Sequence, residues 1–161
     1  MNSPFPIFFN ELLYNGNFEI WSSGPDSLPD EWNDMTAGWQ EGSGKETTII
    51  KSGIASLRVI GNGLSFPTCV VLVNAMNFNI VNGKKVTFGC YVYATVANSI
   101  YLSLIDDSWI LRNSPYHTGN GTWQWLEVSA IMYSPGVAYA TLVVENTTTT
   151  VYFDGAQAHL S

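Results

Sequence analysis

Apolar and polar side chains alternate with a period of two residues through most of this 161-residue chain. Such alternation predicts strands where Val, Ile, Thr, Tyr and Phe dominate, because these side chains suit a pleated, half-buried surface. Turn-forming Gly, Asn and Asp residues separate the segments at a spacing typical of a sandwich. The candidate strands cover residues 46–50, 55–60, 69–74, 85–94, 99–105, 123–132, 138–145 and 150–160. We therefore predict one all-β domain, a jelly-roll-like antiparallel β-sandwich.

The same alternation assigns side chains to the two sides of each strand. In the segment 85–94, Val86, Phe88, Cys90 and Val92 form an apolar row that is expected to face the core. The opposite set is rich in aromatic residues, and exposed aromatic side chains in such numbers are typical of a recognition surface. We expect these outward residues to share one sheet face: Tyr91, Tyr93, Tyr101, Trp125 and Tyr139, with Glu127 and Glu145.

Composition excludes several classes of partner. The chain carries 13 acidic against 6 basic residues, a formal charge of −7, so it has no basic face to neutralise phosphates. We expect no nucleic-acid partner and no binding to anionic membranes. No apolar run approaches the ~20 residues that span a bilayer, so no membrane insertion is expected. Cys69 and Cys90 both lie in apolar segments; buried free thiols are the favoured interpretation, and a disulfide is the alternative.

The sequence lacks the constellations that catalysis requires. It has no Gly-x-Ser-x-Gly motif, and its only histidines are His117 and His159, which do not form a metal-binding pair. Glycoside hydrolysis needs two carboxylates that flank one bond, and the candidates among the outward residues are Glu127 and Glu145. A broad sheet face seldom encloses such a bond. We therefore predict a binding protein and not an enzyme.

Five motifs in the correct order resemble the carbohydrate-binding modules of families four, nine and twenty-two. The first motif is the opening Leu12-Leu-Tyr-Asn-Gly-Asn-Phe-Glu19 together with the Pro29-Asp-Glu-Trp32 stretch that follows it. The other four motifs are a Ser-Gly strand, a Gly-Lys strand, a Gly-Thr-Trp strand and a closing Val-Tyr-Phe-Asp-Gly-Ala element, which start at Ser52, Gly83, Gly121 and Val151. It covers roughly residues 12–160. It implies a jelly roll of the galactose-binding type, with a concave sheet face that holds a glycan chain.

The resemblance also implies a structural calcium ion that ties the first and last strands together. Carried over residue by residue, its ligands would be the carboxylates of Glu19 and Asp154 and carbonyl oxygens near Asn17 and Lys51. This donor set suits calcium, which takes six to eight hard oxygens. The alternative is that Glu19 is a solvated charge and Asp154 a turn residue. The family usually has Asp where this chain has Asn17, which would weaken the site.

Aromatic rings suit sugars because the apolar C–H face of a pyranose matches the negative face of a ring, while neighbouring carboxylates bind hydroxyls. The expected ligand-binding residues are Tyr91, Tyr93, Tyr101, Trp125, Glu127 and Glu145. Trp39, Trp109 and Tyr116 are expected to wall the site, whereas Trp21, Trp32 and Trp123 are assigned to packing. The alternative is that some of these rings cover the sandwich or contact another subunit.

The setting follows from resemblance alone. The chain begins at a methionine without a basic signal-peptide region, and it resembles modules carried by virion proteins of tailed phages. We expect display on the virion surface, on capsid or tail, with attachment to host-surface or mucus glycans; an extracellular location is the alternative. Residues 1–11 are expected to form an extended arm that contacts a capsid or tail protein or another copy of the chain. The competing hypothesis is a structural virion protein that uses the aromatic face for subunit contacts.

Overall fold

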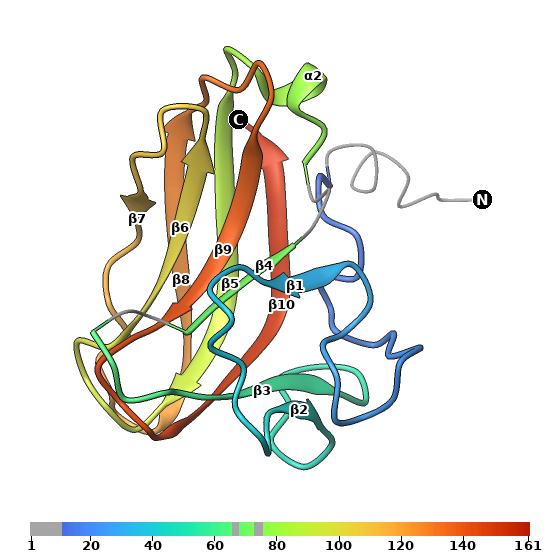
Figure 1. Cartoon of the computed structure of the whole chain (residues 1–161), viewed down its shortest axis with the longest axis vertical. Helices are drawn as coiled ribbons and strands as arrows, with labels where there is room; N and C mark the ends of the chain where they lie inside the picture. Colours follow the sequence, from blue (N-terminus) through green and yellow to red (C-terminus); the bar gives the residue numbers. More distant parts are fainter. Residues whose placement is uncertain (1–10, 66–67, 73–75) are drawn as a thin grey trace.

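The computed structural model describes residues 11–65, 68–72 and 76–161, the segment 68–72 by its backbone pairing alone. These residues form two antiparallel sheets of five strands, the predicted β-sandwich (Figure 1). Sheet A has the strand order β1 (Trp32–Asp34), β4 (Thr68–Leu72), β9 (Ala138–Val144), β6 (Ile100–Asp106) and β7 (Arg112–Asn113). Sheet B has the order β2 (Gly44–Glu46), β3 (Ser56–Ile60), β10 (Thr150–Leu160), β5 (Lys85–Ala94) and β8 (Thr122–Ile131).

The core lies between the two sheets and follows the alternation of the sequence. Val86, Phe88, Cys90 and Val92 of β5 are fully buried, as predicted, and they form one cluster with inward side chains of sheet A such as Leu102. Burying each large apolar side chain contributes about 1.5–3 kcal/mol before chain entropy is subtracted. Cys90 is a buried free thiol. The side chain of Cys69 lies outside the part of the chain that the structure describes.

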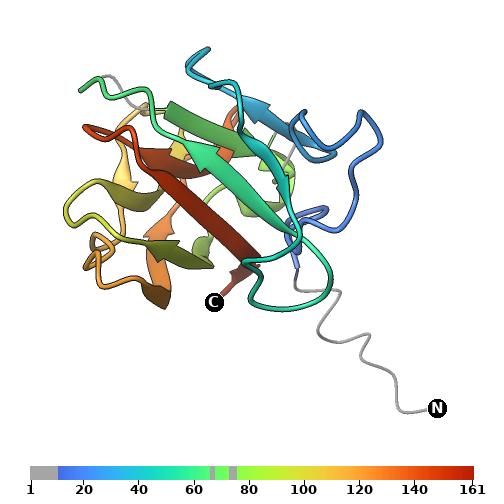
Figure 2. The ribbon, with the colours of Figure 1, turned by 90° about the horizontal axis from the view of Figure 1, so that it is seen from below.

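The chain passes several times from one sheet to the other. The chain passes from β5 in sheet B to β6 in sheet A, then from β7 in sheet A to β8 in sheet B, and again from β9 to β10. Figure 2 shows the sandwich from below, along the long axis of the molecule. Because of this crossing, outward residues that are close in sequence point to opposite sides of the sandwich.

The predicted strand at residues 46–50 is mostly wrong. The strand β2 ends at Glu46, where Oε1 of the side chain accepts hydrogen bonds from the amides of Thr47, Thr48 and Ile49. These bonds curl the backbone into a turn, because the amides are no longer available to a sheet. The short strands β1 and β7 and the helix α2 (Phe78–Val81) were not predicted.

The helix α2 lies at the same end of the sandwich as the C-terminus (Figure 1). Within the part of the chain that the structure describes, no helix is long and apolar enough to cross a membrane. The predicted arm lies outside the described residues except for Glu11, whose carboxylate accepts the amide of Ala158 on β10 at 2.9 Å. The amide of Leu12 donates a hydrogen bond to the carbonyl of Ala158, so residues 11 and 12 are held against β10.

Asp106 holds the turn that follows β6. Its buried carboxylate accepts hydrogen bonds from the amides of Ser108 and Tyr133 and forms an ion pair with Nη1 of Arg112 at 2.7 Å. Burial alone would raise the pKa of Asp106, but the bonds from Ser108, Tyr133 and Arg112 together lower it below its usual value. The ionised carboxylate therefore stabilises the folded state.

We expect Asp106→Asn to lower the free energy of unfolding at pH 7 by about 2 kcal/mol, as for a lost set of hydrogen bonds to a charged group. A lowered folded-state pKa contributes stability that is present above the unfolded value of about 4 and is lost as the pH falls through the folded value. The difference in melting temperature between wild type and variant should therefore shrink below about pH 4. Melts followed by circular dichroism from pH 7 to pH 2 check this, with the exposed Asp26→Asn as control. A difference independent of pH would contradict it.

Candidate functional site

The predicted ligand-binding residues divide between the two sheets. Tyr91 and Tyr93 on β5 and Trp125 and Glu127 on β8 belong to sheet B. Tyr101 on β6 and Glu145, directly after β9, belong to sheet A, as does Tyr139. The prediction that all of them share one face is wrong. The reason is the crossing of the chain between β5 and β6, which alternation within a single strand does not reveal.

Sheet B carries five aromatic side chains on the outer side of neighbouring strands, which we call the aromatic face: Tyr91, Tyr93, Trp123, Trp125 and Tyr152. Tyr91 is paired with Trp125 across β5 and β8, and their ring centroids lie 4.9 Å apart. The ring of Tyr93 contacts Trp123 at 5.7 Å and Tyr152 at 5.8 Å. All three contacts are edge-to-face, a geometry that aromatic pairs prefer. The rings therefore support one another on the outer side of three neighbouring strands.

The indole of Trp125 lies directly on the backbone of a glycine in the neighbouring strand. Gly89 lies in the middle of β5, and a Cβ atom built on it would overlap Cζ2 of the Trp125 indole. The indole therefore lies over the glycine, and its Nε1 donates a hydrogen bond to Oε1 of Glu127 at 3.2 Å. Trp125 nevertheless stays 40% exposed. The ring is thus fixed from below and from one edge while part of its surface remains open to solvent.

Polar side chains border the aromatic face. The ammonium group of Lys51 lies 4.9 Å from the centroid of the Tyr91 ring, a cation–π contact. Glu127 and Gln157 are exposed and belong to the same cross-strand row, since both are paired with Gly89. A carboxylate, an amide and a cation are therefore available beside the rings for hydrogen bonds to a ligand.

The outer side of sheet A is covered at its centre. Tyr101 is only 6% exposed, because the ring of Tyr116 packs against it at 5.3 Å and Met35 packs against it and Val143. The expectation that Tyr101 presents an open ring is therefore wrong. Glu145 accepts a hydrogen bond from the hydroxyl of Tyr116 at 3.2 Å.

Trp109, which is 57% exposed, contacts Tyr139 on β9 at 6.1 Å. A pocket of about 390 Å³ adjoins Tyr139 and reaches the α2 residue Phe78. The predicted wall residues Trp109 and Tyr116 thus lie on the sheet A side, and Trp39 packs against the main core.

The two carboxylates that could have formed a catalytic pair are separated by the sandwich. Glu127 lies on sheet B and Glu145 follows β9 of sheet A. Glycosidases need both carboxylates beside one bond, so these two residues do not provide that arrangement.

Glu19 and Asp154 converge on the turn at residues 51–55. Oδ2 of Asp154 accepts the amides of Lys51 and Ser52, and Oε1 of Glu19 accepts that of Ile54. Gly53 has a φ of +69°, and a Cβ there would overlap Glu19, so glycine is required for this approach. Burial, and to a lesser extent the charge of Glu19, raise the pKa of Asp154, although backbone amides oppose them. The turn thus places the carboxylates of Glu19 and Asp154 close enough for their charges to interact.

These residues fit a calcium ion in part. Each carboxylate oxygen can accept about two bonds. Among the described residues, Oδ1 of Asp154 accepts one hydrogen bond, from the amide of Gly155, and Oε2 of Glu19 accepts one, from the amide of Ile54. Both side chains therefore keep an acceptor position for a cation. No group of three or more His, Cys, Asp or Glu side chains suited to a metal occurs among the described residues. Backbone carbonyls such as those near Asn17 and Lys51 would have to complete the coordination.

Two residues of the aromatic face were missed by the sequence analysis. Trp123 was assigned to packing, yet it lies half-buried beside Tyr93 on the outer side of β8. Tyr152 was not singled out at all. Its position was readable from alternation, because Val151 and Phe153 on either side of it are fully buried. Trp32, by contrast, does pack in the core as predicted, against Phe18.

Known structures show where this fold occurs. The chain is similar to the xylan-binding CBM22-1 domain of Paenibacillus barcinonensis Xyn10C, with a TM-score of 0.63 and 13% identity over 94% of this chain and 91% of that one. It is similar to TmCBM61 in complex with β-1,4-galactotriose, with a TM-score of 0.60 and 15% identity over 94% and 99%. It also matches 22% of the bacteriophage CBA120 tailspike protein 4 enzymatically active domain, at 10% identity over 95% of this chain and a TM-score of 0.62.

No protein-family model matches the sequence, and no curated protein does either. The likeness to solved structures therefore rests on shape at low identity, and it confirms the fold predicted from the sequence motifs. The chain has the jelly-roll fold of carbohydrate-binding modules.

Proposed function

We propose that this protein is a non-catalytic carbohydrate-binding module whose site is the aromatic face of sheet B. The observation that carries the proposal is the seating of Trp125 over Gly89, with the indole held by Glu127 and part of its surface exposed. The exposed part of this indole leaves apolar ring surface in contact with water, which is unfavourable. A ligand that covers an apolar ring surface accounts for it.

The chemistry of the face suits a sugar. Ring surfaces stack on the C–H side of a pyranose, and the bordering groups of Glu127, Gln157 and Lys51 offer hydrogen bonds to its hydroxyls. Tyr91, Tyr93, Trp125 and Glu127 keep their predicted role, and Trp123 and Tyr152 join them. Tyr101 and Glu145 are left out because they belong to the other sheet. The solved neighbours support this choice of ligand class, since their names describe binding of xylan and of a galactotriose.

We extend the proposal to the setting of the protein. Display on a virion, on capsid or tail, would let the module attach a particle to host-surface or mucus glycans, and the likeness to a tailspike domain supports this. The alternative is a structural virion protein in which the aromatic face packs against another subunit. The exposed ring cluster supports this alternative as well, because aromatic side chains are also common at protein interfaces.

Affinity electrophoresis against a panel of soluble polysaccharides tests the proposal. We expect the wild-type protein to be retarded by at least one neutral polysaccharide and to elute as a monomer in gel filtration. A protein that no polysaccharide retards, and that forms an oligomer broken by Trp125→Ala, would support the structural alternative and overturn the proposed function.

We also propose that calcium binds between Glu19 and Asp154, where it would relieve the repulsion between the two carboxylates. A ligand that binds only the folded state stabilises it, by about 2.7 kcal/mol at a hundred times its Kd. We expect calcium to raise the melting temperature, EDTA to lower it, and Glu19→Gln to remove the difference. Glu41→Gln, an exposed carboxylate elsewhere, should keep it. Identical melting curves in calcium and EDTA would contradict the calcium site.

A further inference from the structure

One cross-strand row connects the aromatic face to the edge of sheet B. Trp123 on β8 is paired with Tyr93 on β5, Tyr93 with Tyr152 on β10, and Tyr152 with Arg58 on β3. Leu57 and Val59 are fully buried, so Arg58 lies on the same outer side as the rings. Neighbouring strands are about 4.8 Å apart, a spacing comparable with the length of one pyranose unit in an extended chain. The row thus offers one side chain per strand and per sugar.

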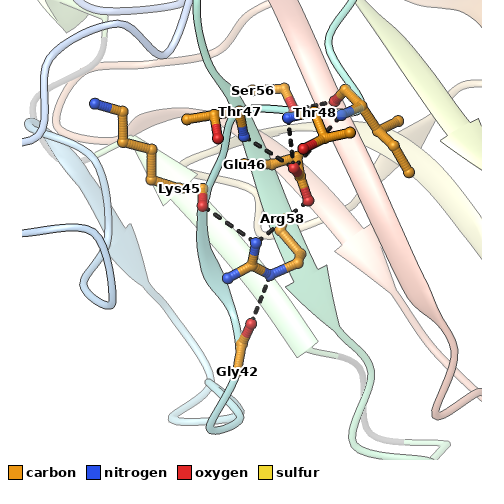
Figure 3. A network of polar contacts seen from close by, with 8 residues as sticks. Gly42, Lys45, Glu46, Thr47, Thr48, Ser56 and Arg58 are labelled. Atoms are coloured by element: carbon orange, nitrogen blue, oxygen red, sulfur yellow. Dashed lines mark hydrogen bonds and ion pairs between the residues drawn. The ribbon is translucent and has the colours of Figure 1, made fainter.

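The guanidinium of Arg58 is fixed at the end of this row (Figure 3). Its Nε donates to the carbonyl of Gly42 at 2.7 Å, and its Nη1 donates to the carbonyl of Lys45 at 3.1 Å and to Oε2 of Glu46 at 3.3 Å. Within the described residues no hydrogen bond engages Nη2. Three bonds thus hold the group in one orientation while one nitrogen with two hydrogens is left to donate.

Charge at this end of the row is balanced. Glu46 forms an ion pair with Arg58, and both groups are close enough to Tyr152 to act on its phenol. Burial and the charge of Glu46 raise the pKa of Tyr152, and Arg58 opposes them. A ligand therefore meets a neutral pair here, on a protein whose formal charge is −7. An acidic polysaccharide would gain nothing from the pair and would be repelled by the protein as a whole.

We propose that an uncharged, extended polysaccharide lies across the strands of sheet B, over Trp123, Tyr93 and Tyr152, and that Nη2 of Arg58 donates a hydrogen bond to a hydroxyl of the sugar over β3. This inference rests on the proposed function and adds to it the direction of the chain, its uncharged character and a specificity-determining residue. Four strands span three spacings, about 14 Å. The site is therefore filled by about four sugar units.

Calorimetry with oligosaccharides of two to six units, prepared from a polysaccharide that retards the wild type, tests this inference. Affinity should rise with length up to about four units and then level off. Arg58→Met should weaken binding of the longer oligosaccharides about tenfold, as expected for a lost hydrogen bond from a charged donor. Two-unit fragments that bind over β8 and β5 should bind equally to both proteins. Lys84→Met, which removes an exposed cation outside the row, is the control and should bind like the wild type.

The outcomes separate this inference from the proposed function. Equal affinities of wild type and Arg58→Met at every length, or a plateau already at two units, would overturn the inference while retention by a polysaccharide still supports the function. A preference for acidic over neutral polysaccharides would overturn its uncharged ligand. Because Arg58 also holds β2, melting curves accompany each variant. If Arg58→Met does not fold, the length series on the wild type decides.

Discussion

Trp125→Ala should weaken glycan binding more than any other single change on the surface. The ring is the most exposed member of the aromatic face and is held at a fixed place by Gly89 and Glu127. Truncation of a central aromatic residue typically costs about 2 kcal/mol or more, which is roughly thirtyfold in Kd. The fold should be unaffected, because Trp125 is not part of the main core. Isothermal titration calorimetry with an oligosaccharide that the wild-type protein binds measures the change in Kd.

Trp109→Ala is the matched control for this prediction. Trp109 is a tryptophan of comparable exposure on the side of sheet A, so its replacement removes the same chemistry from the opposite side of the sandwich. We expect its affinity to equal that of the wild type. If Trp109→Ala weakens binding and Trp125→Ala does not, the site lies on sheet A and the assignment to the aromatic face is wrong.

Gly89→Ala should reduce the affinity almost as much as removal of the tryptophan itself. The added Cβ would overlap the indole of Trp125 and force the ring away from the sheet. The strand itself should accept alanine, since glycine within a strand is about 0.5–1 kcal/mol less favourable. We therefore expect a folded protein of similar melting temperature whose binding is impaired. This combination would not follow from a general loss of stability.

The double variant Gly89→Ala/Trp125→Ala makes that prediction specific. If glycine acts through the ring, the double variant should bind no more weakly than Trp125→Ala, and the two effects should be strongly non-additive. Additive losses would show that Gly89 contributes in another way. If Gly89→Ala binds with unchanged affinity, Gly89 is not needed to position the indole of Trp125.

Much of the fold was predictable because burial follows the chemistry of single strands. The bounds of β5 and β10 agree with the sequence prediction, and the inward row from Val86 to Val92 is buried as expected. The segment after Glu46 failed because a side-chain carboxylate took amides that a strand would have used. The two-residue strand β7 was missed because so short a segment has no periodicity to detect.

The outward orientation of single site residues was predictable from the sequence, but their distribution between the two sheets was not. Alternation correctly turned Tyr91 and Trp125 outward, yet it does not tell which sheet a strand joins, and so Tyr101 was placed with them. The burial of Tyr101 depends on Tyr116, which is brought over it by a loop. The seat at Gly89 is likewise a contact between two strands, and in the sequence it is visible only as a glycine within a strand, a sign of close approach.

The most direct test of a glycan site on sheet B is a two-dimensional ¹H–¹⁵N NMR titration of the labelled protein with an oligosaccharide that it binds. The structure predicts that the indole signals of Trp123 and Trp125 and the amide signals of β5, β8 and β10 shift with increasing ligand, while the indole signal of Trp109 stays in place. Shifts confined to Trp109, Tyr139 and their neighbours on sheet A would contradict the aromatic face as the binding site.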